Sequence, residues 1–376
     1  MPEPRLNTRC VHAAHEPDRA VGAVAEPIYL TTTFERDTDG SYSRGYRYSR
    51  EGSPNRTALE SCMASLEGGV GALAFASGLA ANMAIFELLR AGDRVLAPLE
   101  AYYGTLKQLR EHASARGITV DFTNFSDTAA VQAALAARTR LVWIETPTNP
   151  LMSITDLARV IALAHEAGAW VACDNTFATP VCQTPFEYKA DFVVHSGTKY
   201  LGGHSDVLSG IVVVREDRVL LEQLQNWQRV GGAGLGPFDC WLLRRSIATL
   251  GIRVRAQCRS AQQIAQFLAS HAAIERVHYP GLPGHAGHAI AAAQMPGGFG
   301  AVLSMCLAGG SAAAFATARR TRFFTRATSL GGVESLIEHR ASIEGPGSQT
   351  PDNLLRLSIG IEDTQDLIED LAQALA

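Results

Sequence analysis

The sequence has 376 residues, of which 47% are hydrophobic and 19% charged, and its formal net charge is −4. This length and apolar content suffice for a large core and predict two domains with an arm. The absence of a basic run argues against nucleic acid as a partner. Seven scattered cysteines without a C-x-x-C pair indicate a reducing compartment, and the sequence shows neither a secretory leader pattern nor an apolar run long enough to cross a bilayer. We therefore expect a cytoplasmic protein that does not bind membranes.

The chain divides into three parts along its length. Residues 1–47 are irregular and polar, with turn-prone clusters such as 37–40 (DTDG), which is typical of an arm that wraps a partner. In 48–245, short apolar runs alternate with helical periods and predict a mostly parallel sheet covered by helices, with ligands at the carboxyl ends of its strands. Residues 246–376 continue a helical pattern that spans 242–268. The segment 277–280 (VHYP), a strand-like segment at 300–305 and a last helix at 363–375 complete the pattern of a smaller α/β domain.

A turn of small residues at 75–82 (FASGLAAN) leads into an alanine-rich helical pattern. Its backbone N–H groups suit a phosphate at a helix N-terminus, with ordinary capping by Ser77 as the alternative. Further along, the strand-like segment 94–97 precedes Tyr102 and Tyr103. An aromatic ring at this place can stack on a flat cofactor, although either tyrosine can equally serve in packing.

The apolar run 141–144 (LVWI) predicts a buried strand that ends in the proline-fixed loop 145–150 (ETPTNP). If a cofactor with a phenolic oxygen binds here, the side chain of Asn149 in this loop is a candidate for contact with that oxygen. The next apolar segment ends at Asp174. A carboxylate in this position either caps the following helix or pairs with a protonated ring nitrogen.

Lys199 lies in the run 195–204 (HSGTKYLGGH), just after the strand-like stretch 191–194. Most lysines are solvated at the surface, but here Ser196 and Thr198 offer hydroxyl groups to a phosphate one turn from the amine. Pyridoxal phosphate (PLP) requires an amine for its aldehyde and an acid for its pyridine nitrogen. Lys199 and Asp174 together therefore predict a PLP site.

Two further patterns in the chain are only weak indications of a metal site and of a nucleotide site. His285 and His288 have a metal-like spacing, but the sequence shows no third ligand nearby, so we expect no metal site. The glycine-rich run 231–236 resembles a nucleotide fingerprint only loosely, because it does not lie between a strand and a helix of a βαβ unit.

The motifs resemble those of the Cys/Met metabolism group of PLP enzymes, the trans-sulfuration family. Its members include cystathionine γ-lyase, cystathionine γ-synthase, cystathionine β-lyase, methionine γ-lyase and the O-acylhomoserine sulfhydrylases. The resemblance starts near Pro27 and is carried by the segments 48–50 (YSR), 76–78 (ASG), 145–150, 171–177 (VACDNTF), 196–200 (SGTKY), 329–335 (SLGGVES) and 356–360 (RLSIG). It implies the α/β architecture of fold-type-I PLP-dependent transferases, with a mostly parallel central sheet and a smaller C-terminal α/β domain.

The resemblance also implies a role for each matching residue. Lys199 binds the cofactor aldehyde and later moves protons between substrate carbons, Asp174 pairs with the pyridinium nitrogen, and Tyr102 stacks on the ring and assists the leaving group. The other implied cofactor contacts are Ser77, Gly78, Leu79, Asn149, Ser196 and Thr198.

Two more groups of residues follow from the same resemblance. Tyr48 and Arg50 reach into the site of a neighbouring subunit and bind the cofactor there, within a homotetramer that is built from obligate dimers. Arg356 clamps the α-carboxylate of an amino-acid substrate, with Asn149 and Ser329 nearby. For Arg356, the alternative is a strand-edge arginine in a salt bridge.

Three positions bear on the substrate. Glu334 follows an apolar residue, as in γ-acting members of the family, and favours γ-chemistry. Gly104 stands where methionine γ-lyases tend to carry a cysteine, so that specificity is disfavoured. Lys107 stands where members that bind cystathionine or acylhomoserine often have an arginine. It either contacts a distal carboxylate of the substrate or is an ordinary lysine on a helix surface.

The chain departs from the family pattern at two places. Ser53 and Asn55 replace the Asn and Thr of the usual Asn-Pro-Thr, and the segment 340–348 (RASIEGPGS) replaces the more common Pro-Ala-Ser-Met-Thr-His beside the substrate pocket.

The segments 141–147 and 279–283 (YPGLP) resemble the cystathionine γ-lyase branch of this family. From this resemblance we expect a cystathionine γ-lyase that cleaves cystathionine to cysteine, 2-oxobutanoate and ammonia. The alternative is γ-replacement on an O-acylated homoserine, by a cystathionine γ-synthase or an O-acylhomoserine sulfhydrylase. A cystathionine β-lyase or a methionine γ-lyase fits less well. A catalytically silent binding protein on the same fold is the remaining alternative, and the intact Lys199, Asp174 and Arg356 argue against it.

Overall fold

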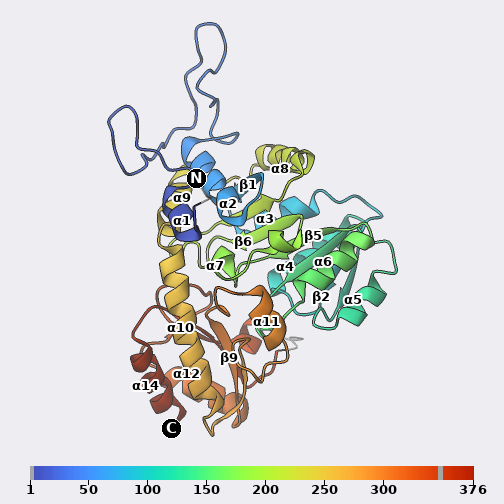
Figure 1. Ribbon diagram of the computed structural model, residues 1–376, viewed down its shortest axis with the longest axis vertical. Coiled ribbons are helices and arrows are strands. Elements are labelled where there is room, and N and C mark those ends of the chain that lie inside the picture. The colour runs from blue at the N-terminus through green and yellow to red at the C-terminus, as the bar shows by residue number, and fades with distance from the viewer. Residues whose placement is uncertain (1–3, 346–349) are drawn as a thin grey trace.

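The computed structural model describes residues 4–345 and 350–376. Within these ranges the chain forms two β-sheets, which are covered by helices and connected by the long helix α10 (Leu250–Ala269) (Figure 1). The first three residues of the predicted arm lie outside the described residues, and so do residues 346–348 of the atypical segment.

The larger sheet has seven strands in the order β1-β7-β6-β5-β4-β2-β3. The strands from β6 through β3 pair in parallel, and β7 runs antiparallel to both of its neighbours. Their bounds are β1 (Gly71–Phe75), β2 (Arg94–Pro98), β3 (Thr119–Thr123), β4 (Leu141–Glu145), β5 (Trp170–Asp174), β6 (Phe192–Ser196) and β7 (Gly210–Val214). The prediction of a mostly parallel central sheet is confirmed.

Helices cover both faces of this sheet, which explains why its strands are almost continuously apolar. In β1, Leu73 and Phe75 pack with α3 (Gly78–Phe86) and α8 (Arg218–Gly231), while Ala72 and Ala74 face the layer of α2 (Pro54–Glu67) and α9 (Pro237–Ile247). The other helical segments around this sheet are α4 (Tyr103–Lys107), the π-helical η1 (Gln108–Ala113), α5 (Thr128–Ala134), α6 (Leu157–Glu166), α7 (Thr179–Cys182) and the 3₁₀-helical η2 (Pro185–Tyr188).

The second sheet is smaller and mixed, with the strand order β10-β11-β12-β9-β8. Its strands are β8 (Ile274–His278), β9 (Val302–Leu307), β10 (Thr325–Arg326), β11 (Leu336–His339) and β12 (Leu354–Ser358). The helices around it are α11 (His288–Gln294), α12 (Gly310–Arg320), α13 (Arg340–Glu344) and α14 (Thr364–Leu375). The expected smaller C-terminal α/β region is therefore present.

One expected helix is divided in the structure. The helical pattern at 242–268 belongs to α9 and α10, and the two helices are separated at Ala248 and Thr249. The predicted domain boundary between 245 and 246 falls inside α9, and the division of the chain into domains stays a prediction.

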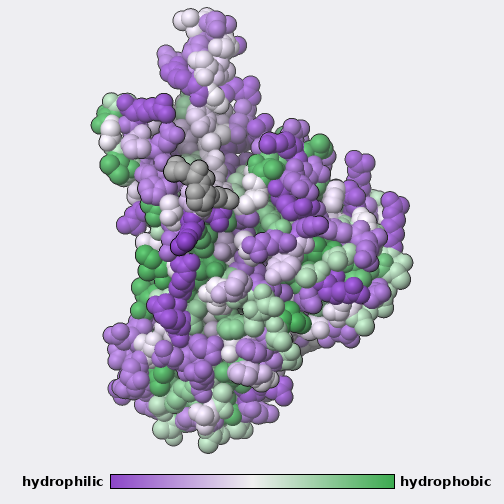
Figure 2. Space-filling model, in the orientation of Figure 1, coloured by the Kyte–Doolittle hydropathy of each residue, from purple (hydrophilic) through white to green (hydrophobic). Residues whose placement is uncertain are grey.

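The arm is less irregular than expected, because it contains the short helix α1 (Leu6–His12). Arg244 anchors this helix by donating hydrogen bonds to the carbonyl oxygens of Cys10, Val11 and Ala13. The rest of the arm projects as extended loops (Figure 1), and Figure 2 shows the projecting part mostly in the colours of polar and intermediate residues. No helix among the described residues is long and apolar enough to span a membrane.

Candidate active site

The candidate site is a cavity of about 310 Å³ at the carboxyl ends of β4, β5 and β6. The second sheet also contributes to its lining, through β12 and the loop before β11. Most of the predicted residues meet there: Ser77, Gly78, Leu79, Tyr102, Asn149, Asp174, Ser196, Thr198, Lys199, Ser329 and Arg356. Segments far apart in the sequence thus converge on the sheet edge where parallel sheets bind their ligands.

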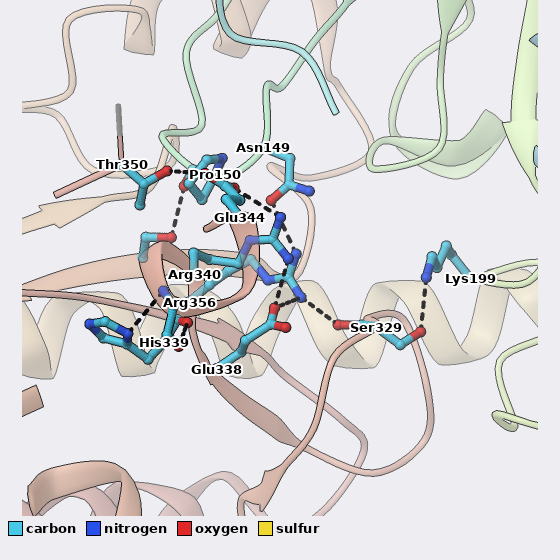
Figure 3. A network of polar contacts seen from close by, with 12 residues as sticks. Asn149, Pro150, Lys199, Ser329, Glu338, His339, Arg340, Glu344, Thr350 and Arg356 are labelled. Carbon is cyan, nitrogen blue, oxygen red and sulfur yellow. Dashed lines mark hydrogen bonds and ion pairs between the residues drawn. The ribbon is translucent and has the colours of Figure 1, made fainter. Parts of the chain in front are cut away.

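Lys199 lies in the tight turn after β6 and lines the cavity. Its Nζ donates a hydrogen bond to the hydroxyl oxygen of Ser329 at 3.0 Å (Figure 3). Burial is the main cause that lowers the pKa of this amine from 10.5 to about 8, and the positive charge of Arg356 lowers it further. An amine with such a pKa is partly neutral near pH 7, so it can act as a nucleophile or as a base.

Ser329 links Lys199 to Arg356. Its backbone has a φ of 92°, in the left-handed region that non-glycine residues seldom adopt. The hydroxyl group accepts the hydrogen bond from Lys199, and the carbonyl oxygen accepts one from Nη2 of Arg356 at 2.7 Å. A strained residue at a site of this kind points to a geometric requirement of the site.

The predicted phosphate cradle is the start of α3. Ser77 caps this helix, because its Oγ accepts a hydrogen bond from the backbone N–H of Ala80 at 3.1 Å. The N–H groups of Gly78 and Leu79 precede the first intrahelical hydrogen bond, and both residues line the cavity. Gly210 on β7 leaves room for this turn, since a Cβ atom there would collide with the carbonyl of Ser77. Capping and anion binding are therefore compatible here.

Ser196 and Thr198 line the cavity beside this helix start, where a Cβ on Gly78 would lie 3.1 Å from that of Ser196. The backbone N–H of Ser196 donates to Oγ1 of Thr176 at 2.9 Å. Thr198 Oγ1 donates to the carbonyl oxygen of Ser209 at 3.2 Å and accepts from its N–H at 3.0 Å. These contacts fix the turn that carries Lys199, while both predicted side chains line the cavity.

Asp174 and Glu145 end the neighbouring strands β5 and β4 and are partners in the strand register. Burial raises the pKa of both carboxyl groups, and the negative charge of Asp174 raises that of Glu145 further. Asp174 accepts a hydrogen bond from the N–H of Thr176 at 3.0 Å, and Glu145 accepts one from the N–H of Tyr102 at 2.7 Å. A protonated ring nitrogen beside Asp174 would offset the unfavourable burial of these two acids.

The donors and acceptors around this cavity fit PLP. The aldehyde, ring nitrogen and phosphate of that cofactor require an amine, an acid and an anion site, and Lys199, Asp174 and the N-terminus of α3 offer these groups around one cavity. Tyr102 directly precedes α4 and lines the same cavity, so its ring is placed for contact with a flat ligand.

Arg356 lies on β12, directly opposite Glu338 on β11. Its Nη2 is 2.6 Å from Oε2 of Glu338, and its Nη1 donates to Oδ1 of Asn149 at 3.1 Å. The sequence left open whether Arg356 clamps a substrate or forms a strand salt bridge. The structure contains the salt bridge and also places Arg356 in the cavity lining. Burial lowers the pKa of the guanidinium to about 10, so it is still charged at neutral pH.

Four predicted site residues lie outside the lining of this cavity. Tyr48 is 40% exposed, and the guanidinium of Arg50 stands over its ring at 5.4 Å. Glu334 accepts a hydrogen bond from the hydroxyl of Ser205. Lys107 lines a neighbouring cavity of about 380 Å³, to which Asn149 also contributes. The roles assigned to these four residues stay predictions.

Sequence reasoning missed two charged residues of the site. Glu145 had a usable signal, because it ends the strand next to that of Asp174 and adjacent parallel strands end at one edge of a sheet. Arg340 lines the cavity from α13, and its only signal was the unusual segment in which it lies.

The two histidines with metal-like spacing have other partners. Nδ1 of His288 is 2.7 Å from the carbonyl oxygen of Pro280, and Nδ1 of His285 accepts a hydrogen bond from the N–H of Gly287. Across residues 4–345 and 350–376, no group of three His, Cys, Asp or Glu side chains could hold a metal ion.

Comparisons with known proteins show the family of the chain. The sequence model of the Cys/Met metabolism PLP-dependent enzymes matches residues 7–376. Cystathionine γ-synthase of Mycobacterium tuberculosis is 46% identical over 374 residues, which cover 98% of this chain and 96% of the relative. Cystathionine γ-lyase of Bacillus subtilis is 41% identical over 379 residues, which cover 99% of each chain.

A solved structure also resembles the chain over its full length. Cystathionine γ-synthase from Xanthomonas oryzae pv. oryzae in complex with cystathionine superimposes with a TM-score of 0.96. It is 41% identical, and the match covers 99% of this chain and 98% of that one. The chain belongs to the Cys/Met metabolism family of PLP-dependent enzymes.

Proposed function

We propose that the protein joins an O-acylated homoserine to cysteine in a γ-replacement that yields cystathionine. The connection of Lys199 to Arg356 through Ser329 carries this proposal. An amino acid whose α-carboxylate binds Arg356 would present its α- and β-carbons to the amine of Lys199. The choice of γ-replacement over γ-elimination rests on the relative named cystathionine γ-synthase, which is 46% identical over 98% of this chain.

In this proposal each residue of the cavity has a task. PLP, held by Lys199, Asp174 and the start of α3, supplies an acceptor for the electrons that a substrate releases on losing its α-proton. Lys199, with a pKa of about 8, takes and returns protons at the substrate carbons. Tyr102 lines the cavity wall and would assist the departing group. Arg356, with Asn149 beside it, keeps the substrate oriented.

The second candidate is γ-elimination of cystathionine to cysteine, 2-oxobutanoate and ammonia. Two observations favour it: the segments 141–147 and 279–283 resemble the cystathionine γ-lyase branch, and the Bacillus subtilis relative of that name is 41% identical. Both reactions begin with the same proton transfers by Lys199, from the α- and β-carbons of the substrate. They differ in whether a thiol or water completes the reaction at the substrate.

A product assay separates the two candidates. The holoprotein is incubated either with O-acetyl- or O-succinyl-L-homoserine plus L-cysteine, or with L-cystathionine alone, and the products are quantified by mass spectrometry. The proposal predicts that cystathionine forms faster from the first mixture than 2-oxobutanoate forms from the second. The reverse order would establish the lyase. Pyruvate and homocysteine, or no product from either mixture, would reject both candidates. The Lys199→Ala variant is the matched control and is expected to be inactive.

We further propose a homotetramer built from dimers, in which Tyr48 and Arg50 complete the cavity of a neighbouring copy. The projecting arm and the exposure of Tyr48 support this arrangement (Figure 1). The test mixes Arg50→Ala with Lys199→Ala, each inactive alone. Shared sites predict that activity returns in the mixture, because a hybrid dimer contains one intact site. No recovery despite hybrid formation would reject shared sites, and native mass spectrometry checks the tetramer.

The cytoplasmic location also stays a proposal. It is supported by the seven cysteines, all of which are buried and free.

A further inference from the structure

Four charged side chains form a cluster at the cavity, on the side of the second sheet (Figure 3). Oε2 of Glu338 lies 2.6 Å from Nη2 of Arg356 and accepts a hydrogen bond from Nη1 of Arg340 at 3.1 Å. Arg340 in turn donates from Nη2 to Oε1 of Glu344 at 2.9 Å, one helical turn further along α13. Two guanidinium groups therefore share one carboxylate, and a second carboxylate faces the outer guanidinium.

Arg340 is part of the site and not a surface residue. Its side chain is 4% exposed and lines the same cavity as Lys199 and Arg356. Its Nε finds no hydrogen-bond partner among the residues that the structure describes, although the atom is buried. A buried cation at a cavity wall with an unused donor is poised for an anionic ligand.

The charges of the cluster explain what Arg340 adds. Paired with Glu338 alone, Arg356 would form a neutral unit with little attraction for a substrate carboxylate. Arg340 offsets the charge of Glu338, so that the three side chains carry one net positive charge. Glu344, whose side chain is 14% exposed, brings the formal charge of the four side chains to zero, but it pairs with Arg340 and not with Arg356.

We infer that Arg340 is a positioning residue that sets the positive charge with which Arg356 meets the α-carboxylate of the substrate, and that Glu344 opposes it. The inference rests on the proposed function in so far as Arg356 binds that carboxylate. It predicts opposite effects of two substitutions on one five-residue helix: removal of Arg340 weakens amino-acid binding, and removal of the Glu344 charge strengthens it.

The test uses the holoprotein and two unreactive probes. L-norvaline has an α-carboxylate and no leaving group, and n-butylamine is the same molecule without the carboxylate. Their dissociation constants are measured from the visible absorbance of the bound cofactor. Arg340→Gln is expected to raise the constant for norvaline about tenfold, since it removes one partly screened charge near the carboxylate, and to leave that for butylamine unchanged.

Two further variants sharpen the result. Arg340→Lys keeps the charge and is expected to restore most of the norvaline affinity, and Glu344→Gln is expected to tighten norvaline binding a few-fold, which damage to the fold cannot do. Equal shifts for both probes, no shift in Arg340→Gln, or no rescue by lysine would overturn the inference. The inference would also fail if Arg340→Gln weakened the binding of cystathionine but not that of norvaline, because Arg340 would then contact the distal carboxylate of cystathionine.

These binding measurements need no turnover of a sulfur-containing substrate. A protein that shows the predicted pattern but makes no cystathionine and cleaves none would refute the proposed function and leave the inference standing. A protein that turns over its substrate normally in the Arg340→Gln form would refute the inference alone.

Discussion

The ionisation of Lys199 offers the sharpest quantitative prediction, because the structure places its pKa at about 8 in place of the ordinary 10.5. At pH 7 this amine is neutral in about 10% of molecules, against roughly 0.03% for an ordinary lysine, which is a difference of about 300-fold. Burial and the nearby charge of Arg356 are the causes. The reactive neutral form is therefore abundant at physiological pH.

The assay labels the cofactor-free protein with a small neutral acylating reagent, such as acetic anhydride, and measures each modified lysine by mass spectrometry between pH 6 and 11. The sequence has three lysines, and the exposed Lys107 and Lys189 serve as internal references for the reagent. The labelling rate of Lys199 should level off above pH 8. Burial slows the reagent at every pH, so the position of the inflection is the measured quantity. A rate that keeps rising tenfold per pH unit to pH 10 would show that Lys199 has the pKa of an ordinary lysine.

The causes of the shift can be tested in the same assay. Arg356→Gln removes a positive charge that lowers the pKa of Lys199, so its inflection should move to higher pH. The shift also has a consequence for stability. Between pH 8 and 10.5 the unfolded chain binds more protons than the folded one, so the cofactor-free protein gains stability as the pH rises through this window. Lys199→Met should stabilise it by up to about 3 kcal/mol at pH 7, and the gain should vanish above pH 10.5.

Three further predictions concern the cradle, the charge cluster and the core. In Gly210→Ala the new Cβ would collide with the carbonyl of Ser77 and lie 2.8 Å from the Cα of Gly78, so PLP affinity in equilibrium dialysis should fall at least about tenfold. Gly284→Ala meets open space and is the control; similar losses in both variants would contradict this account. Glu338→Gln leaves two buried guanidinium groups without their shared carboxylate, and we expect a loss of about 3 kcal/mol in urea unfolding at pH 7. The seven buried cysteines should not react with a bulky thiol reagent until the chain unfolds, and rapid labelling of the native protein would contradict the packing described here.

The central sheet could be predicted because its strands are short apolar runs bounded by glycine, proline and polar turns. Phe192–Ser196, which leads to Lys199, and Leu141–Glu145, which leads to the loop with Asn149, are examples. Motif residues at the ends of such strands converge in space because parallel strands share one edge. Lys199, Asp174 and Ser77 could therefore be assigned to one site from the sequence.

The remaining parts of the site depend on relations that no local pattern contains. Glu338 and Arg356 face each other only because β11 and β12 pair in one particular register. Ser329 has a left-handed backbone although it is not a glycine, so the sequence carries no signal for this conformation. The assignment of Tyr48 and Arg50 requires a second copy of the chain, so the fold of a single chain leaves it as a prediction.

The most direct test of the account is the location of the cofactor on the chain. The purified holoprotein is reduced with borohydride, digested, and searched for a pyridoxyl phosphate group by peptide mass spectrometry. The sequence has three lysines, Lys107, Lys189 and Lys199, so few lysine peptides need to be compared. We expect the group on Lys199 alone. A group on either of the other two lysines, or none in protein saturated with PLP, would contradict this expectation.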